Sequence, residues 1–598
     1  MILNALVDYY DRMAADPESD VAPFGFSKQK ISFEILLKSD GALSRFNAVA
    51  REEEGRRLPR LLIVPGQSKP SGSGLNPGFL WDNSQYMLGF KPDDPRPERS
   101  RAAFEAFRDR HLAAEMEIDD SGFSAVCRFL KAWSPETATQ HPELADVVMA
   151  FGVFRFEGAQ EYVQERAKVR EYWVGRLGTD ETGPLAPSLL SGERQPIARL
   201  HEPKIKGVRG SQSAGALLVS FNEDAYESYG KSQSFNAPVG VQDAFKYCTA
   251  LNALTMMRSR QAHLGDTTVV FWAGKPHPIE DDLATFFEGA DSPTEEREGN
   301  GPAEDRATIS RLTAFLDRLR RAAEGVPFEG ADVPFYLLGL SPNAGRISVR
   351  FWIAGTVETF AERLGRHLFD MEMAGRPQHP PPISLQRILD QTARERADIP
   401  PLLGGAVLRA VLTGGPYPTA LATAVLRRIR ANGQTKEVDE HIRASILKAW
   451  LIRNARRSGK TEGIAMGLDL NCQNKSYLLG RLLAVLESVQ REAFERKLNT
   501  TIKDRYFSAA SAHPRTAFVP LMKLSNHHLR AVRTEKPKLA GYFEKLIEEI
   551  YSKIVVNDSF PAFLPLDEQC LFFVGYYHQR SYRSIDAKDD SAFDAQED

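Results

Sequence analysis

The sequence is poor in the features that mark exported, membrane-bound or disulfide-linked proteins. It has four cysteines in 598 residues, and no two of them stand close enough for a zinc site or a disulfide framework. No stretch of about 18 uncharged apolar residues occurs, so no transmembrane helix is predicted. The apolar residues 1–7 are followed at once by Asp8, without the apolar core and cleavage site of a signal peptide. We therefore predict a soluble, cytoplasmic protein.

Catalytic motifs are also missing. No HExxH, GxSxG or paired CxxC occurs. Lys460 and its neighbours resemble the end of a phosphate-binding loop, but Asn454 stands where that loop needs glycine. Asp281 and Asp282 are adjacent, which is weak support for a nuclease site. We predict no catalytic residue, no metal and no cofactor, and we assign core positions to all four cysteines, Cys127, Cys248, Cys472 and Cys570.

The chain is too long for a single hydrophobic core, so at least two domains are expected. Apolar runs predict strands at residues 31–37, 60–64, 217–221 and 267–272, and a helix at 241–258. Beyond residue 384 the pattern becomes helical, with one further strand predicted at 570–574. The prediction is an α+β protein, with a mixed α/β N-terminal region at residues 1–383 and an α-helical bundle at residues 384–598.

Charge is balanced overall but not locally. The 76 Lys and Arg nearly cancel the 79 Asp and Glu. However, residues 443–460 hold six basic residues and no acidic one, and residues 475–553 hold fifteen basic against eight acidic residues. Such stretches suit a phosphate backbone. The candidate contacts are Arg453, Arg456, Arg457, Lys460, Arg515, Lys523, Arg530 and Arg533, with Tyr506 and Phe507 as stacking residues.

Two other interpretations of this region stay open. Charged runs are often only solvated helix faces. His527 and His528 could bind a metal, although neighbours in a helix point to different faces and no third ligand is placed.

Several short motifs, taken together in order, point to a known family. They include Gly72-Ser-Gly-Leu-Asn-Pro77, Asn236-Ala-Pro-Val239, Ala244-Phe-Lys-Tyr247 and Tyr477-Leu-Leu-Gly-Arg481. With the opening residues 1–10 and the segment 79–89, they resemble the large subunit of the type I-C CRISPR Cascade complex.

This resemblance implies a crRNA-guided antiviral complex in which base pairing reads the target sequence. The N-terminal region would dock in the complex, recognise a TTC-like protospacer-adjacent motif in double-stranded DNA and help to open the duplex. The displaced strand would lie on the basic helical region, and a helicase-nuclease would be recruited for cutting. Small polar and amide side chains in the glycine-rich loop are the candidate motif contacts: Gln67, Ser68, Lys69, Ser71, Ser73, Asn76 and Asn83.

The resemblance also implies partners. These are crRNA-containing backbone and guide-end-capping subunits and copies of a small subunit, for which Met466 is the candidate internal start within this chain. Two alternatives remain: a metal-dependent nuclease of a CRISPR system, and a structural scaffold that only holds guide RNA.

Overall fold

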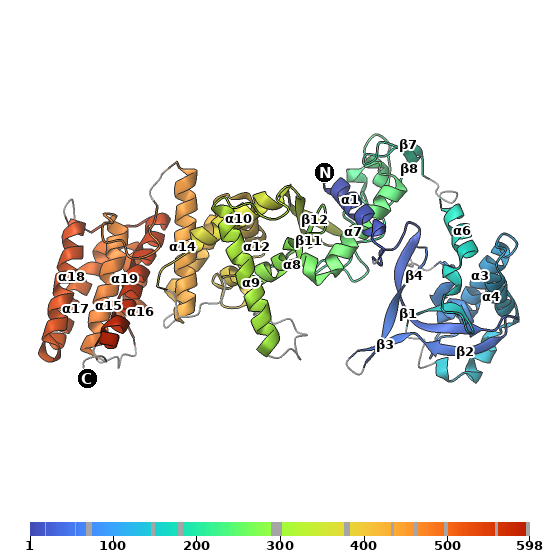
Figure 1. Cartoon of the computed structure of the whole chain (residues 1–598), viewed down its shortest axis with the longest axis horizontal. Coiled ribbons are helices and arrows are strands. Elements are labelled where there is room, and N and C mark those ends of the chain that lie inside the picture. Colours follow the sequence, from blue (N-terminus) through green and yellow to red (C-terminus); the bar gives the residue numbers. More distant parts are fainter. Residues whose placement is uncertain are drawn as a thin grey trace. The chain divides into compact units, whose positions relative to one another are not determined.

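The computed structural model divides the chain into two compact units, which are described separately (Figure 1). The first unit holds Met1–Lys206 and Ser213–Ala253, and the second holds Gly207–Gln212 and Leu254–Asp598. No helix in the described part of the chain is long and apolar enough to cross a membrane. The described residues are 1–593 without 18, 54–55, 67–73, 145–149, 178–182, 289–301, 376–382, 432–435, 460–462, 495–499 and 556–559.

The first unit contains a six-stranded sheet, against which some of its helices pack. Its helices are α1 (Ile2–Ala15), α2 (Ser84–Leu88), α3 (Pro97–Ala114), α4 (Ser121–Ala132), α6 (Ala167–Arg176) and most of α7 (Val241–Met256), which continues into the second unit after Ala253. Its strands are β1 (Phe26–Leu37), β2 (Leu43–Ala48), β3 (Ala50–Glu53), β4 (Arg56–Pro65), β5 (Trp81–Asn83) and β6 (Phe151–Phe156), and β7 (Leu185–Pro187) pairs with β8 (Arg194–Pro196) in a separate ribbon.

The central strand of this sheet is β1, because one of its edges holds two partners in succession. β4 pairs antiparallel with Phe26–Ile31, β2 pairs antiparallel with the stretch from Phe33 to Leu37, and β6 runs parallel along the other edge. Alternate β1 residues Phe33 and Ile35 are fully buried in an apolar cluster that also contains residues of α3 and α4. The strands predicted at 31–37 and 60–64 are confirmed as parts of β1 and β4.

The second unit combines a four-stranded antiparallel sheet, in the order β12-β11-β10-β9, with many helices. Its strands are β9 (Gln261–Leu264), β10 (Thr267–Ala273), β11 (Pro334–Asn343) and β12 (Arg346–Thr356). Its helices are α8 (Ile279–Glu288), α9 (Pro302–Ala323), α10 (Val357–Met371), α11 (Leu385–Asp390), α12 (Leu403–Thr413), α13 (Thr419–Ala431), α14 (Glu437–Arg457), α15 (Lys475–Ala493), α16 (Ile502–Ala512), α17 (Pro514–Glu535), α18 (Pro537–Val555) and α19 (Leu566–Phe593).

The α+β class is confirmed, and every described element after residue 383 is a helix. The division into compact units nevertheless lies near residue 253, and the expected boundary at 383 falls inside the second unit. The physical reason is a shared core: one apolar cluster includes Phe351 of β12, Val407 of α12 and Phe572 of α19. The roles expected for residues 1–383 and 384–598 stay predictions.

Two strand predictions are wrong. Residues 570–574 lie within α19, where every residue from 572 to 579 is buried, so the helix lacks the polar face that would reveal its period. Residues 217–221 form no strand. The neighbouring Ala216 pairs with Ile205 in an isolated bridge. A short apolar run alone does not distinguish a strand from a buried helix or from an irregular segment.

Two glycines let the backbones of α15 and α19 touch. A Cβ atom added to Gly480 would overlap the carbonyl oxygen of Phe572, and one added to Gly575 would overlap the carbonyl oxygen of Tyr477. The Tyr477-to-Arg481 motif therefore marks a helix contact: the Tyr477 hydroxyl lies 3.0 Å from His578 Nδ1, and Arg481, fully buried, donates to Gln579 at 2.9 Å.

Substituting Gly480 tests this contact. We expect Gly480→Ala to lower the free energy of unfolding by about 1–3 kcal/mol, because the methyl group forces two backbones apart. Gly541→Ala in α18 is the matched control, because its new Cβ meets no atom within 4 Å. There the change from Gly to Ala in a helix should raise the free energy of unfolding by about 0.5–1 kcal/mol. Urea denaturation of both variants measures the difference, and equal stabilities would contradict the close contact.

Candidate nucleic-acid interface

Strands of the first sheet hold the two ends of the predicted motif-recognition loop. β4 ends at Pro65 and β5 begins at Trp81, and the Trp81 indole N–H donates to the Pro65 carbonyl at 2.6 Å. The Gly66 N–H donates to the Gly25 carbonyl at 2.7 Å, just before β1. Both ends of the segment from 66 to 80 are thus fixed to one sheet.

A buried histidine shapes the exit of this loop. Leu80 has a φ of 63°, a left-handed conformation that leucine rarely adopts, and its N–H donates to His111 Nε2 at 2.8 Å. His111 Nδ1 lies 2.7 Å from the Phe107 carbonyl, so the hydrogen bonds assign the proton to Nδ1 of a neutral ring. Burial lowers the pKa of His111 to about 3. The loop exit is therefore held by an uncharged imidazole.

The predicted loop contacts are only partly visible. Asn76 is exposed, and its N–H donates to the Tyr86 hydroxyl at 3.1 Å. Asn83 is half-buried, and its Oδ1 caps α2 by accepting from the Tyr86 N–H at 3.3 Å. This capping role was missed, although Asn before a helix is a known cap signal. Five of the predicted contacts lie outside the described residues: Gln67, Ser68, Lys69, Ser71 and Ser73.

The structure corrects the prediction that Arg453 contacts DNA. Its side chain is 1% exposed, and its Nε donates to Asp370 Oδ2 at 2.8 Å. A second guanidinium nitrogen donates to the carbonyls of Ala410 and Gly415 at 2.8 and 2.9 Å. The charge is satisfied inside the protein, by a carboxylate 83 residues away in sequence.

The other basic residues of the run 443–460 are partly buried or paired, and only some are exposed. Arg443 and Lys448 are also buried, because much of α14 lies in the core of the second unit. Arg456 is exposed but pairs with Asp370 at 2.9 Å, and Arg457 is exposed at the end of α14. Lys460 lies outside the described residues. This run is therefore a much weaker nucleic-acid surface than its charge count predicts.

One face of α17 presents basic side chains to solvent. Lys523, His527 and Arg530 are exposed at intervals of four and three residues, which places them on the same side of the helix. Within the described part of the chain, the side chains of Lys523 and Arg530 have no ion-pair or hydrogen-bond partner. We call these three residues the α17 basic face.

The other two predicted cations of α17 are exposed but engaged. Arg515 Nε donates to the Phe560 carbonyl at 3.0 Å. Arg533 pairs with Glu544 of α18, which packs beside α17. The local sequence from 513 to 533 has no carboxylate, but the neighbouring helix supplies one.

The adjacent histidines diverge, as their positions in a helix require. His527 is exposed, whereas His528 is buried with its ring edge-on to Phe494 at 5.5 Å between centroids. Burial and the neighbouring His527 lower the pKa of His528. Among the residues that the structure describes, no group of three His, Cys, Asp or Glu side chains could hold a metal ion.

Of the two predicted stacking residues, one is in the core. Phe507 is buried against Phe572, Phe573 and Tyr576, so its ring is not available to a base. Tyr506 is half-buried, and the Arg505 guanidinium lies 5.7 Å from its ring centroid. Arg505 and Tyr506 line a surface hollow of about 320 Å³. Its other walls are Gln490, Thr500, Thr501, Ile502 and Leu524.

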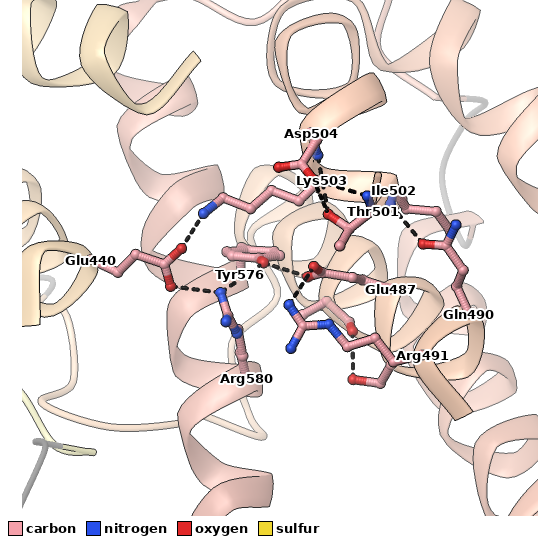
Figure 2. A network of polar contacts seen from close by, with 12 residues as sticks. Glu440, Glu487, Gln490, Arg491, Thr501, Ile502, Lys503, Asp504, Tyr576 and Arg580 are labelled. Atoms are coloured by element: carbon pink, nitrogen blue, oxygen red, sulfur yellow. Dashed lines mark hydrogen bonds and ion pairs between the residues drawn. The ribbon is translucent and has the colours of Figure 1, made fainter. Parts of the chain in front are cut away.

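A largely buried polar network joins four helices and shares Gln490 and Ile502 with this hollow (Figure 2). Glu440 of α14 pairs with Lys503 of α16 and, at 2.6 Å, with Arg580 of α19. The Tyr576 hydroxyl donates to Glu487 of α15. The network extends to Arg491, which pairs with Glu487 at 2.9 Å, and to Gln490, which accepts from the Ile502 N–H at 2.7 Å.

Glu440 is the carboxylate that two of these cations share. Burial alone would raise its pKa, but the charges and hydrogen bonds of Lys503 and Arg580 outweigh burial, and the pKa is lowered. The group is therefore ionised when folded, and its pairing stabilises the protein above the pKa of the unfolded chain.

The acidic pair that could have favoured a nuclease is neutralised by arginines. Asp281 pairs with Arg260 at 2.6 Å, and Asp282 pairs with Arg311 at 3.0 Å and Arg318 at 2.7 Å. Three of the four cysteines are buried, as predicted for core residues, and Cys472 is half-buried. Neither group resembles a prepared catalytic centre.

Substituting Glu440 tests the network. We expect Glu440→Gln to lower the free energy of unfolding by about 3 kcal/mol at pH 7, because Lys503 and Arg580 lose their anion. Glu548→Gln, at an exposed position of α18, should change stability by less than about 0.5 kcal/mol.

The effect of Glu440 should also depend on pH, with a definite sign. Because the folded pKa is lowered, its contribution is complete above the unfolded value of about 4.3 and is lost as the pH falls toward the folded pKa. Urea denaturation from pH 7 to pH 3.5 should show the difference between wild type and Glu440→Gln shrinking. A constant difference would contradict the assignment.

The comparisons with known proteins agree with the sequence resemblance. No curated protein matches the chain. The model of the family described as CRISPR-associated protein (Cas_Csd1) matches residues 6–583, which is nearly the whole chain. The chain therefore belongs to the Cas_Csd1 family, the large subunits of type I-C CRISPR Cascade.

Proposed function

We propose that this protein is a non-catalytic recognition subunit. In this proposal it reads a protospacer-adjacent motif in double-stranded DNA, helps to open the duplex, holds the displaced strand and helps to recruit the helicase-nuclease. Base pairing with the guide RNA supplies the sequence specificity. Family membership supports a place in the complex, and the individual steps are inferred from the two candidate surfaces.

The α17 basic face is the observation that carries the proposal. Lys523 and Arg530 are seven residues apart, which corresponds to roughly 10 Å along the helix axis. Two exposed cations at that separation can contact phosphates along one strand. The hollow beside Arg505 and Tyr506 adds an aromatic surface, as single-strand binding sites commonly do.

The motif-reading role rests on the loop between β4 and β5. Its ends are fixed at Pro65 and Trp81, and its exit at Leu80 is held in a strained conformation by His111. Backbone strain of this kind persists where surrounding contacts impose it, and it concentrates at functional sites. Asn76 and the predicted loop residues would then supply the donors that meet base edges.

We further propose that the bundle is also made separately from Met466. This start would give a product containing all of α15 to α19. Met466 is exposed ahead of α15, and its carbonyl accepts from the Ala374 N–H at 2.7 Å. Mass measurement of the polypeptides in purified complexes tests the internal start. If no product beginning at Met466 were found there, this proposal would be overturned.

Neutralising the α17 basic face should weaken binding of the displaced strand. We expect Lys523→Gln with Arg530→Gln to reduce affinity for single-stranded DNA about tenfold and to reduce the slope of log affinity against log salt by about 1.4. Lys538→Gln with Lys545→Gln, two exposed cations of α18, is the matched control and should change both quantities less. Fluorescence anisotropy at several salt concentrations measures them, and equal slopes would contradict the assignment.

The central test compares reconstituted complexes with and without this chain. They are offered duplexes that carry a matched target and either a TTC or a scrambled adjacent motif. We expect tight binding only with both the chain and the TTC motif, and no strand cleavage in Mg²⁺. Binding that ignores the motif would favour a scaffold, and cleavage that depends on this chain would favour a nuclease.

A further inference from the structure

A tight hairpin in the first unit presents a tyrosine to solvent at its tip. Tyr229 is 99% exposed. Ser228 and Lys231 pair across the turn, and the Lys231 N–H donates to the Ser228 carbonyl at 3.0 Å. Tyr229 and Gly230 have φ values of 55° and 67°, the two left-handed residues that a two-residue hairpin turn of type I′ requires.

Tyrosine is a costly choice at this position. Asn and Gly are the usual residues at positive φ in such a turn, and a bulky side chain there strains the backbone. The ring is almost completely exposed, so the described residues offer it no compensating contact. Burial within the chain therefore does not explain Tyr229, and a partner that covers the ring would.

The hairpin is built to hold this tip in place. Asn236 accepts from the Ser228 N–H at 2.9 Å and donates to the carbonyls of Lys231 and Gln233 at 2.7 and 2.9 Å. Gln233, itself left-handed with φ 49°, donates its N–H to Glu227 at 2.8 Å. Its side-chain oxygen accepts from Arg199 at 2.8 Å. Asn236 opens the Asn-Ala-Pro-Val motif, so that motif serves as the brace of the hairpin.

The charge of the hairpin indicates the kind of partner. Residues 222–231 hold three carboxylates, from Glu223, Asp224 and Glu227, against the single cation of Lys231. Glu223 and Asp224 are exposed, and Tyr226 beside them is 43% exposed. A net charge of −2 (1 − 3) repels a phosphate backbone and favours a basic surface. Tyrosine is also among the residues that dominate protein–protein binding energy.

We propose that the segment of residues 222–231, in which a 3-10 turn at Asp224–Tyr226 precedes the hairpin, docks this chain onto a protein subunit, with Tyr229 filling an apolar pocket and Glu223 and Asp224 facing a lysine- or arginine-rich rim. The inference rests on the proposed role within a crRNA-guided complex, because it takes the partner to be a protein of the crRNA-bearing core. It adds a docking element that neither candidate nucleic-acid surface contains.

Binding of the full chain to a crRNA-loaded core that lacks it tests the docking. We expect Tyr229→Ala to weaken binding at least tenfold, mainly through faster dissociation. Tyr229→Gly should lose the same affinity while its melting temperature stays equal to or above that of wild type, because glycine accepts the left-handed backbone. Glu223→Lys with Asp224→Lys should also weaken binding. Met116→Ala removes another almost fully exposed side chain of the first unit and should change nothing.

The outcomes separate this inference from the proposed function. Failure of the wild-type chain to bind the core would overturn the proposed function itself. Normal wild-type binding with unchanged binding of Tyr229→Ala would overturn the docking role alone. Normal assembly of Tyr229→Ala with reduced DNA affinity would show a nucleic-acid contact and would overturn the choice of a protein partner.

Discussion

The contact between the backbones of α15 and α19 constrains the rest of the C-terminal bundle. At the distance that Gly480 and Gly575 permit, α15 is buried along most of its length and α19 is buried from Phe572 to Gln579. Their charged side chains must then find partners inside the protein, because a buried, unpaired charge is strongly destabilising. Glu487 accepts from the Tyr576 hydroxyl and pairs with Arg491. Arg481 donates its Nε to the neutral amide of Gln579, and a carboxylate oxygen of Glu549 lies 3.9 Å from its guanidinium. The polar network of Figure 2 follows from this packing.

The same packing decides which cations remain for a ligand. Several cations form ion pairs within the protein: Lys503 and Arg580 with Glu440, Arg453 and Arg456 with Asp370, and Arg533 with Glu544. In the described part of the chain, the α17 basic face, Arg457 at the end of α14 and the α18 cations Lys538 and Lys545 remain exposed. Each phosphate contact that such cations make adds affinity regardless of sequence.

In the first unit, left-handed non-glycine residues occur at Asp93 and at two features to which functions are assigned above. Leu80 at the exit of the loop and Tyr229 at the tip of the hairpin are both left-handed, and each is fixed by side-chain hydrogen bonds, from His111 and Asn236 respectively. One feature belongs to the proposed DNA-reading loop and the other to the proposed docking hairpin. Their braces keep each segment in its conformation before a partner binds, which lowers the entropic cost of binding.

The sequence by itself determined the α+β class, the helical character after residue 383, the strands that flank the loop and the family, because these depend on local periodicity and on ordered motifs. Tertiary structure alone decided the state of each charge, because the carboxylates that neutralise Arg453 and Arg533 come from other helices. It also decided that residues 570–574 are helical, since a helix buried on all sides shows no period. A charge count measures composition, whereas a binding surface requires cations that packing has left unpaired.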